Sequence, residues 1–223
     1  NPIEELDLLF AYIDRKSDDF ELSNDTTLNN SAIKSNSWLA KASYDFNDTQ
    51  AISLNASQSQ DAQRTEFNTT DKGAWGTVYR DVTQTTYNLE YSHHNPNNAW
   101  IDLKVKLGQS QSHITENDAS PSLADFIGLE SDYQYNLNTI DISNTSRLNQ
   151  HALTYGLQYT SQERVGNKTA LPCLKFNRAT YQCEQYGESA ATSQMSSQPA
   201  GEQDRFALYI QEEYQWQALT LTA

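Results

Sequence analysis

Histidine and cysteine are the side chains best suited to metal or ligand chemistry, and this 223-residue chain has four histidines and two cysteines. His93 and His94 are adjacent, and adjacent strand residues point to opposite faces, so the pair cannot reach one metal without a distorted turn. His151 begins an alternating segment beside a short turn, which indicates a structural role. His113 opens a long polar segment and is the histidine best placed to meet an external ligand. We therefore treat His113 as a candidate ligand residue, with an ordinary exposed loop residue as the alternative.

The two cysteines, Cys173 and Cys183, lie ten residues apart in a polar stretch, where an oxidising compartment allows them to close a short loop. The enclosed segment holds two basic and two aromatic residues within a strongly acidic protein, namely Lys175, Arg178, Phe176 and Tyr181. We expect a disulfide at the outer tip of the longest loop. It acts either as a staple alone or also as a contact for a protein partner. Two reduced cysteines without a shared role are the alternative.

No arrangement of side chains in the sequence predicts catalysis. Acidic residues near Asp18 and near Asp125 offer oxygen atoms for a divalent cation, but their spacing matches no calcium-binding loop. A Ser-His-Asp spacing, a glycine-rich phosphate loop and a Cys-x-x-Cys motif are also missing from the sequence. We therefore expect neither an enzyme nor a resident cofactor or metal.

The composition narrows the class of protein further. The chain carries 15 basic and 29 acidic residues, a net charge of -14, without a basic cluster in the sequence, which argues against a nucleic-acid partner. Only 37% of the residues are hydrophobic, yet 11% are aromatic, which is too many for a disordered chain. No stretch approaches the roughly 20 apolar residues of a membrane helix. No signal peptide is recognisable, so we expect a processed or excised segment. A polar chain rich in Tyr and Trp is typical of a transmembrane β-barrel, with its alternating strands and aromatic girdles.

Alternating apolar and polar residues predict about nine strands. Ile140 and Ile142 break the alternation that begins at Tyr135, which suggests a β-bulge there. The predicted strands lie around Leu6–Ile13, Asn36–Asp45, Gln50–Gln60, Tyr87–Ser92, Ile101–Gly108, Tyr135–Ile142, Leu153–Tyr159 and Phe206–Gln211, and from Leu219 onward.

Long and short connections alternate between these strands, which is the pattern of long extracellular loops and short periplasmic turns in bacterial outer-membrane barrels. The predicted long loops are Asp14–Lys34, Gln63–Asp81, His113–Asp132 and Gln162–Asp204. A soluble β-sandwich or a β-solenoid adhesin is the alternative architecture, although the strict loop asymmetry disfavours it.

Open sheet edges are unstable in lipid, so residues 1–223 are expected to be part of a single barrel domain whose remaining strands are absent from this chain. Each strand with its loop takes roughly 25 residues, which points to the large, plugged 22-stranded barrels.

Four passages carry a family resemblance. Thr86–Ser110 (TYNLEYSHHNPNNAWIDLKVKLGQS) joins a tyrosine-rich strand to a Trp-x-Asp-Leu-Lys strand through an Asn-Pro turn, and Gly201–Trp216 (GEQDRFALYIQEEYQW) leads into the closing Ala-Leu-Thr-Leu-Thr. With Asn149–Gln162 (NQHALTYGLQYTSQ), these passages resemble the barrels of TonB-dependent outer-membrane receptors, in particular heme and hemoglobin receptors.

The resemblance implies an outer-membrane location in a Gram-negative bacterium and a role in iron uptake. It further implies a plug domain, absent here, that engages TonB, and outer loops that capture heme, a host heme protein or a ferric siderophore. Heme or an iron chelate would then be the transported ligand, and not a cofactor. The loop motifs that flank the heme-ligating histidine in such receptors are also absent here. An adhesin or autotransporter barrel without an import role is the alternative function.

Overall fold

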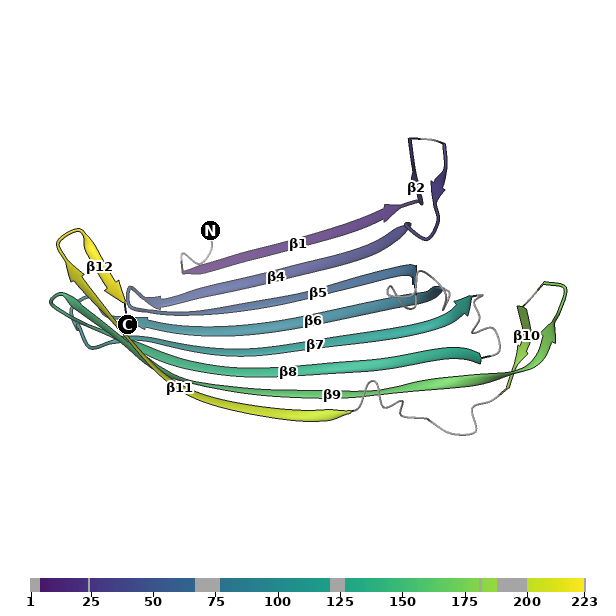
Figure 1. Cartoon of the computed structure of the whole chain (residues 1–223). Helices are drawn as coiled ribbons and strands as arrows, with labels where there is room; N and C mark the ends of the chain where they lie inside the picture. Colours follow the sequence, from purple (N-terminus) through teal and green to yellow (C-terminus); the bar gives the residue numbers. More distant parts are fainter. Residues whose placement is uncertain are drawn as a thin grey trace.

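The computed structural model describes residues 5–23, 25–66, 77–120, 127–180, 182–187 and 200–222. Within these residues, no helix is long and apolar enough to cross a membrane. The described elements are antiparallel β-strands, and the long ones form one curved sheet shaped like a trough (Figure 1).

Nine strands lie side by side across this sheet in the order in which they occur in the chain. The short strands β2 (Phe20–Glu21), β3 (Thr27–Leu28) and β10 (Gln182–Tyr186) lie outside this series. The predicted antiparallel arrangement of about nine strands is therefore confirmed. The nine are β1 (Leu6–Ser17), β4 (Ile33–Asn47), β5 (Gln50–Glu66), β6 (Thr77–His94), β7 (Asp102–Ser120), β8 (Ile127–Leu148), β9 (His151–Asn177), β11 (Gly201–Trp216) and β12 (Leu219–Thr222). β10 pairs with β9, and β2 pairs with β3 in a separate hairpin.

The strand register assigns a different character to each face of the sheet. One unbroken cross-strand row joins Leu8, Ala42, Leu54, Leu89, Leu107, Ile140, Tyr159 and Phe206. The row one residue away lies on the other face and joins Asp7, Ser43, Ser53, Glu90, Lys106, Asp141, Gln158 and Ala207. Because side chains alternate between faces, the first row belongs to an apolar outer face and the second to a polar inner face.

The structure corrects the predicted bulge in β8. Pairing of β8 with β7 and with β9 runs without a register shift through Ile140 and Ile142. The break in alternation instead marks a change of face. Tyr135 and Leu137 lie on the inner face, whereas Ile140 and Ile142 belong to the apolar outer face.

The strands also extend much farther than the alternation predicts. β7 continues to Ser120 and β9 to Asn177, and β11 already begins at Gly201, so the bounds predicted for the long loops are wrong. At about 3.4 Å per residue, the 27 residues of β9 span roughly 90 Å, about three times the thickness of a bilayer core. Strand segments beyond the apolar band are polar on both faces, so alternation of hydrophobicity cannot reveal them.

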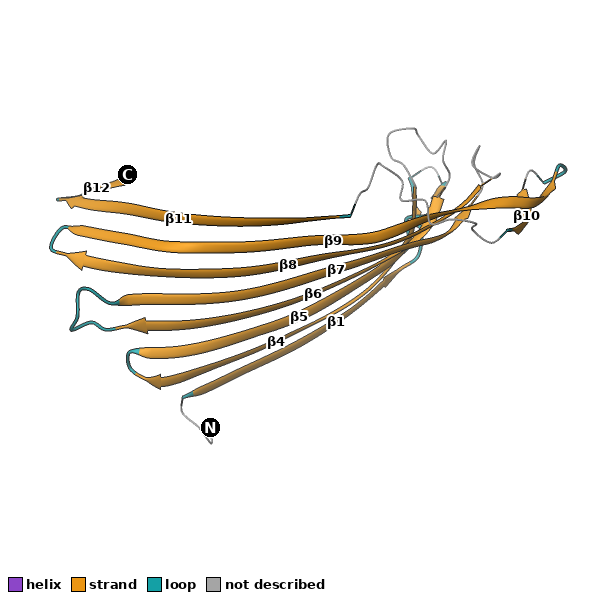
Figure 2. Cartoon of the chain, turned by 90° about the horizontal axis from the view of Figure 1, so that it is seen from below, coloured by secondary structure: helices purple, strands orange, loops and turns teal. Residues whose placement is uncertain are grey.

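The short connections lie at one end of the sheet, which we call the turn end (Figure 2). β8 and β9 are joined there by Asn149 and Gln150, and β11 and β12 by Gln217 and Ala218. Asn149 and Gln217 have φ values of 57° and 55°, the left-handed conformation that tight two-residue hairpin turns require. The predicted short turns are therefore confirmed. The opposite end, where β9 and β10 project, is called the hairpin end.

Candidate functional site

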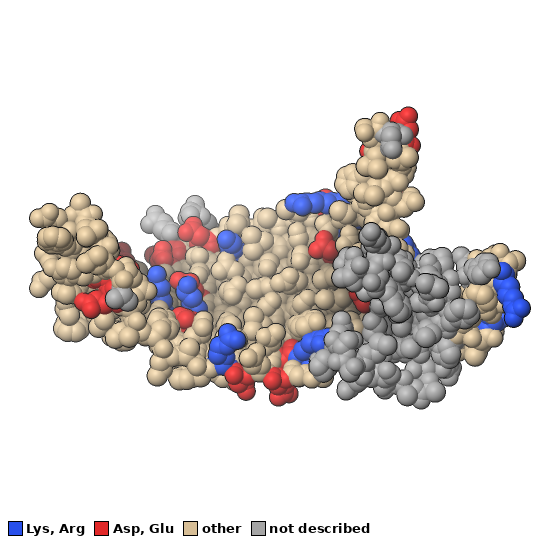
Figure 3. All heavy atoms as spheres, viewed as in Figure 1, with Lys and Arg blue, Asp and Glu red and all other residues tan. Residues whose placement is uncertain are grey.

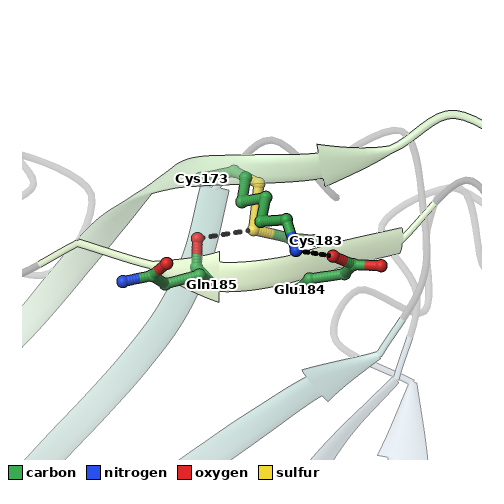
Figure 4. Close-up of a disulfide and its surroundings, with 5 residues drawn as sticks. Cys173, Cys183, Glu184 and Gln185 are labelled. Atoms are coloured by element: carbon green, nitrogen blue, oxygen red, sulfur yellow. Dashed lines mark hydrogen bonds and ion pairs between the residues drawn. A yellow bond between two sulfur atoms is a disulfide. The ribbon is translucent and has the colours of Figure 1, made fainter.

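The most prominent feature at the hairpin end is a disulfide-linked hairpin formed by residues 173–186, which we call the disulfide hairpin. Cys173 of β9 and Cys183 of β10 are joined by a disulfide, with their Cα atoms 5.8 Å apart (Figure 4). The disulfide predicted from the sequence is therefore present. It is carried by an extension of β9 beyond the other strands, and not by an irregular loop (Figures 1 and 2).

Polar contacts fix the geometry of this hairpin. Lys175 Nζ lies 2.6 Å from Glu184 Oε2, and Asn177 Nδ2 donates to Glu184 Oε1 at 2.7 Å. These two contacts, with that of Lys175 the larger, lower the pKa of Glu184 from its ordinary value. The Asn177 side chain also accepts a hydrogen bond from the amide of Ala179, which closes the turn.

The other predicted contact residues of the hairpin differ in their surroundings. Arg178 is exposed at the turn, and basic side chains are visible at the tip of the hairpin in Figure 3. Phe176 is half-buried, and Tyr181 lies outside the described residues. The hairpin thus presents the Arg178 guanidinium, while the charge of Lys175 is balanced by Glu184.

His113 does not join this group. It lies on β7, on the outer face, where its Nε2 atom is 2.7 Å from Asp132 Oδ1. Through Gln134, its row crosses β9 at Val165, ten residues or about 34 Å along the strand from Lys175. The structure therefore separates His113 from the disulfide hairpin and places it on the face opposite the polar inner wall.

The remaining histidines lie at the turn end. His94 Nδ1 is 3.5 Å from Asp102 Oδ1, and His151 Nδ1 is 2.7 Å from Glu212 Oε1. The His151 ring also contacts the Tyr214 ring, with their centroids 4.8 Å apart. No group of three or more potential metal ligands occurs among the described residues.

A second candidate site, which the sequence reasoning missed, lies on the inner face toward the hairpin end. We call it the inner-wall cluster: Arg80, Glu116, Tyr133, Tyr135 and Arg164. Arg80 donates from Nε and from its terminal nitrogen to Glu116 Oε1, at 2.9 and 2.5 Å. The Arg164 guanidinium carbon lies 5.3 Å from the ring centroids of both tyrosines, within the range of cation–π attraction.

The strand register brings these side chains together from four strands. Arg80 is opposite Glu116, and Tyr135 is opposite Arg164. The Tyr133 ring lies against Gly166, where an added Cβ would fall 2.6 Å from the ring, so glycine is needed for this close approach.

The inner-wall cluster has the chemistry of a site for an anionic aromatic ligand. Tyr133 is 5% exposed and Glu116 is 8% exposed, and no hydrogen-bond partner of the Tyr133 hydroxyl occurs among the described residues. Guanidinium groups bind carboxylates, and phenol rings stack on planar ligands.

The sequence contained a usable signal for this cluster. Arg80, Glu116 and Arg164 fell within predicted loops, so no face was assigned to them. Lys104 and Lys106 of β7 point inward, and every second residue of a strand lies on the same face. Glu116 is an even number of residues from both lysines, so continued alternation places it on the inner face. The same alternation would have placed Arg80 and Arg164 on the inner face.

A family model described as "TonB dependent receptor-like, beta-barrel" matches residues 15–223. Two curated relatives are TonB-dependent heme receptor A proteins of Haemophilus. The protein of Haemophilus influenzae (strain 86-028NP) is 32% identical over 148 residues, which cover 62% of this chain and 18% of the relative. The protein of Haemophilus ducreyi (strain 35000HP / ATCC 700724) is 27% identical over 247 residues, which cover all of this chain and 32% of the relative. The chain thus spans less than a third of the length of these relatives.

Solved structures with the same fold include two transporters and one receptor. The copper transporter OprC superposes with a TM-score of 0.70 at 12% identity, covering 94% of this chain and 30% of OprC. The FrpB iron transporter from Neisseria meningitidis (F5-1 variant) gives a TM-score of 0.67 at 21% identity, and the match covers 98% of this chain and 36% of FrpB. A double mutant of the Serratia marcescens hemophore receptor HasR, in complex with its hemophore HasA and heme, gives a TM-score of 0.59 at 14% identity. This match covers 94% of this chain and 38% of HasR. At these identities the likeness establishes the fold alone.

Proposed function

Because this chain belongs to the TonB-dependent receptor β-barrel family, we propose that it forms part of the outer-membrane barrel of a receptor that imports heme. The observation that carries the cargo assignment is the sequence similarity to two heme receptors, one of which aligns with the whole chain. In this assignment the turn end faces the periplasm and the hairpin end faces the exterior. The protein acts as a receptor and transporter, and not as an enzyme.

The architecture of the sheet supports a proposal for the rest of the receptor. Within the described strands, β1 and β12 each pair with one neighbour, and a strand edge left open in lipid is costly. The relatives are about three to six times as long as the part that aligns with this chain. We propose that further strands of the same receptor close the barrel, to about 22 strands, and that a plug domain engages TonB.

Both candidate sites suit this function. The inner-wall cluster lies on the face that would line the receptor interior, near the exterior entrance, and offers Arg164 and the half-buried Tyr135 to a planar ligand with carboxylate groups. The disulfide hairpin projects farther outward and carries the exposed Arg178. We assign to it a first contact with a host heme protein and to the inner wall a later contact with heme itself.

Spectral titration of the complete receptor with hemin tests the cargo. A heme receptor gives a saturable shift of the Soret band. The double substitution Tyr135→Phe with Arg164→Gln should weaken hemin binding roughly tenfold through lost polar contacts. The matched control is Lys41→Gln with Ser43→Ala, two inner-face changes on β4, remote from the cluster.

Two other results would replace the heme assignment. Uptake of a ferric siderophore without a Soret shift would indicate a siderophore receptor with the same barrel. A parent gene that encodes no plug domain would instead favour an adhesin or autotransporter barrel without an import role.

A further inference from the structure

The distribution of basic side chains over the two faces of the sheet is uneven. Leaving the disulfide hairpin aside, eleven Lys and Arg residues with described side chains lie on strands of the sheet. The register places eight of them on the inner face. The three on the outer face are Lys16 of β1, Lys34 of β4 and Arg64 of β5.

These three cations are neighbours in space, although they are far apart in the sequence. Lys16 is directly opposite Lys34. Lys34 is opposite Ala62, and Arg64 lies two residues farther along the same face of β5, which is a diagonal contact of about 7–8 Å. We call Lys16, Lys34 and Arg64 the outer basic row.

A pair of lysines directly opposite each other is unfavourable unless an anion neutralises it. Both lysines are exposed, and the ion pairs between described residues include neither of them. The outer-face carboxylates with described side chains in adjoining positions are Asp14, two residues before Lys16, and Asp81, opposite Ala62. Glu66 follows Arg64 by two residues on the same face of β5, and Arg64 Nη1 donates to Thr77 Oγ1 at 3.1 Å. Asp81 accepts two hydrogen bonds from Gln60, at 3.2 and 3.0 Å. The facing lysines Lys16 and Lys34 therefore form an exposed pair of like charges on an acidic protein, and this pair is the core of the outer basic row.

The height of the row on the barrel wall identifies what it faces. Tyr12 is opposite Trp38, and Trp38 Nε1 donates to Gln58 Oε1 at 3.3 Å, so this aromatic pair marks the change from apolar to polar side chains on the outer face. Lys16 lies four residues beyond Tyr12, about 14 Å along the strand, and roughly 10 Å in height for a tilted barrel strand. Flexible lysine side chains can extend back toward the membrane surface.

We propose that the outer basic row binds the phosphate groups of a phosphorylated lipid in the outer leaflet that surrounds the barrel. The row lies on the lipid-facing side, just beyond the aromatic boundary, where head-group phosphates are found, and the sheet brings the cations within reach of one head group. The proposal rests on the outer-membrane location and is independent of the transported cargo.

The test uses the complete receptor, purified in mild detergent, and measures its binding of bisphosphorylated lipid A by native mass spectrometry. Each basic residue near an anionic lipid surface contributes about fivefold, so Lys16→Gln, Lys34→Gln and Arg64→Gln together should weaken binding roughly 100-fold. The charge-matched control carries Lys41→Gln, Lys104→Gln and Arg205→Gln, three inner-face changes, and should bind like the unmodified receptor. Lipid A stripped of its phosphates should bind the unmodified receptor as weakly as bisphosphorylated lipid A binds the outer-face variant.

Equal lipid A binding by the outer-face and control variants would overturn the proposal. Displacement of lipid A by inorganic phosphate at equal concentration would also overturn it, because the row would then be a site for small anions. If the triple variant fails to assemble, as judged by heat-modifiable mobility in gels, the double variants decide. Lys16→Arg with Lys34→Arg should retain binding, whereas Lys16→Gln with Lys34→Gln should lose it by roughly 25-fold. Lipid A binding without a hemin-induced Soret shift would leave this proposal intact and remove only the heme assignment.

Discussion

The Arg80–Glu116 ion pair is a bidentate polar contact of the inner wall, and it is more buried than the Lys106–Glu90 ion pair on the same wall. The Glu116 side chain is 10% exposed and that of Arg80 is 33% exposed, whereas Lys106 and Glu90 are 54% and 39% exposed. Desolvation makes the loss of one partner costly only in the first pair.

Glu116→Gln should therefore lower the free energy of unfolding of the complete receptor by about 1–2 kcal/mol, because the Arg80 charge loses its carboxylate partner in a partly buried site. Glu90→Gln, which removes the partner of the exposed Lys106, should change it by less than about 0.5 kcal/mol. Urea-induced unfolding followed by tryptophan fluorescence measures both. Equal effects of the two substitutions would show that burial does not distinguish the pairs.

Gly156 is a second residue whose identity is fixed by its neighbours. A Cβ atom at this position would lie 2.5 Å from the Ile142 carbonyl oxygen and 2.6 Å from the Tyr209 ring. Gly156→Ala should therefore destabilise the barrel by about 1–3 kcal/mol, the usual effect of overpacking. Gly201→Ala is the matched control, because nothing lies within 4 Å of its added Cβ. Unfolding midpoints that agree for the two variants would contradict the close packing of Tyr209 over Gly156.

Among the elements, the disulfide hairpin is the one whose conformation depends on a covalent link. Within this hairpin, β10 pairs with the end of β9 over a short stretch that includes register shifts, so few backbone hydrogen bonds hold the two strands together. A cross-link over a loop of this length contributes about 2–3 kcal/mol by restricting the open chain. The link should therefore stabilise the hairpin locally without affecting the long strands.

Replacing both Cys173 and Cys183 with Ser should leave barrel insertion unchanged and make the hairpin sensitive to trypsin at Lys175 and Arg178. Limited proteolysis of the complete receptor in outer membranes, with fragments identified by mass spectrometry, measures the change. The unmodified receptor treated with reductant serves as a control that alters no residue. Identical cleavage rates in the oxidised receptor and the serine variant would mean that the disulfide does not protect the hairpin. If the serine variant captures ligand as well as the unmodified receptor does, the disulfide has a structural role only.

For the whole molecule, the two faces of the sheet determine how it sits in a membrane. Leu157 belongs to the outer apolar face and lies beside Ile142 and Leu208, whereas Lys104 lies on the polar inner face. Leu157→Arg should impair insertion at a cost of about 2–4 kcal/mol near the bilayer midplane, and Lys104→Glu should assemble normally. Heat-modifiable mobility of outer-membrane fractions reports assembly. Normal insertion of both variants would mean that the faces are assigned in reverse or that the sheet lies outside the membrane.

Much of the architecture was predictable from the sequence because lipid imposes a strict pattern on the part of each strand that it covers. Leu103, Val105 and Leu107 alternate with Lys104 and Lys106, and this alternation specifies both the strand and its faces. The nine strands, their order and the short turns follow from it. The cysteine spacing also predicted the disulfide.

Only the tertiary structure decided where strands end beyond the membrane and which distant residues meet. Outside the lipid both faces are polar, so the extension of β9 to Asn177 left no periodic signal, and Arg164 was assigned to a loop. Cross-strand register, which depends on the pairing of whole strands, then placed Tyr133 beside Arg164 and Lys16 opposite Lys34. The basic residues that the sequence shows as scattered are gathered into one row because three neighbouring strands present them at similar heights on the same face.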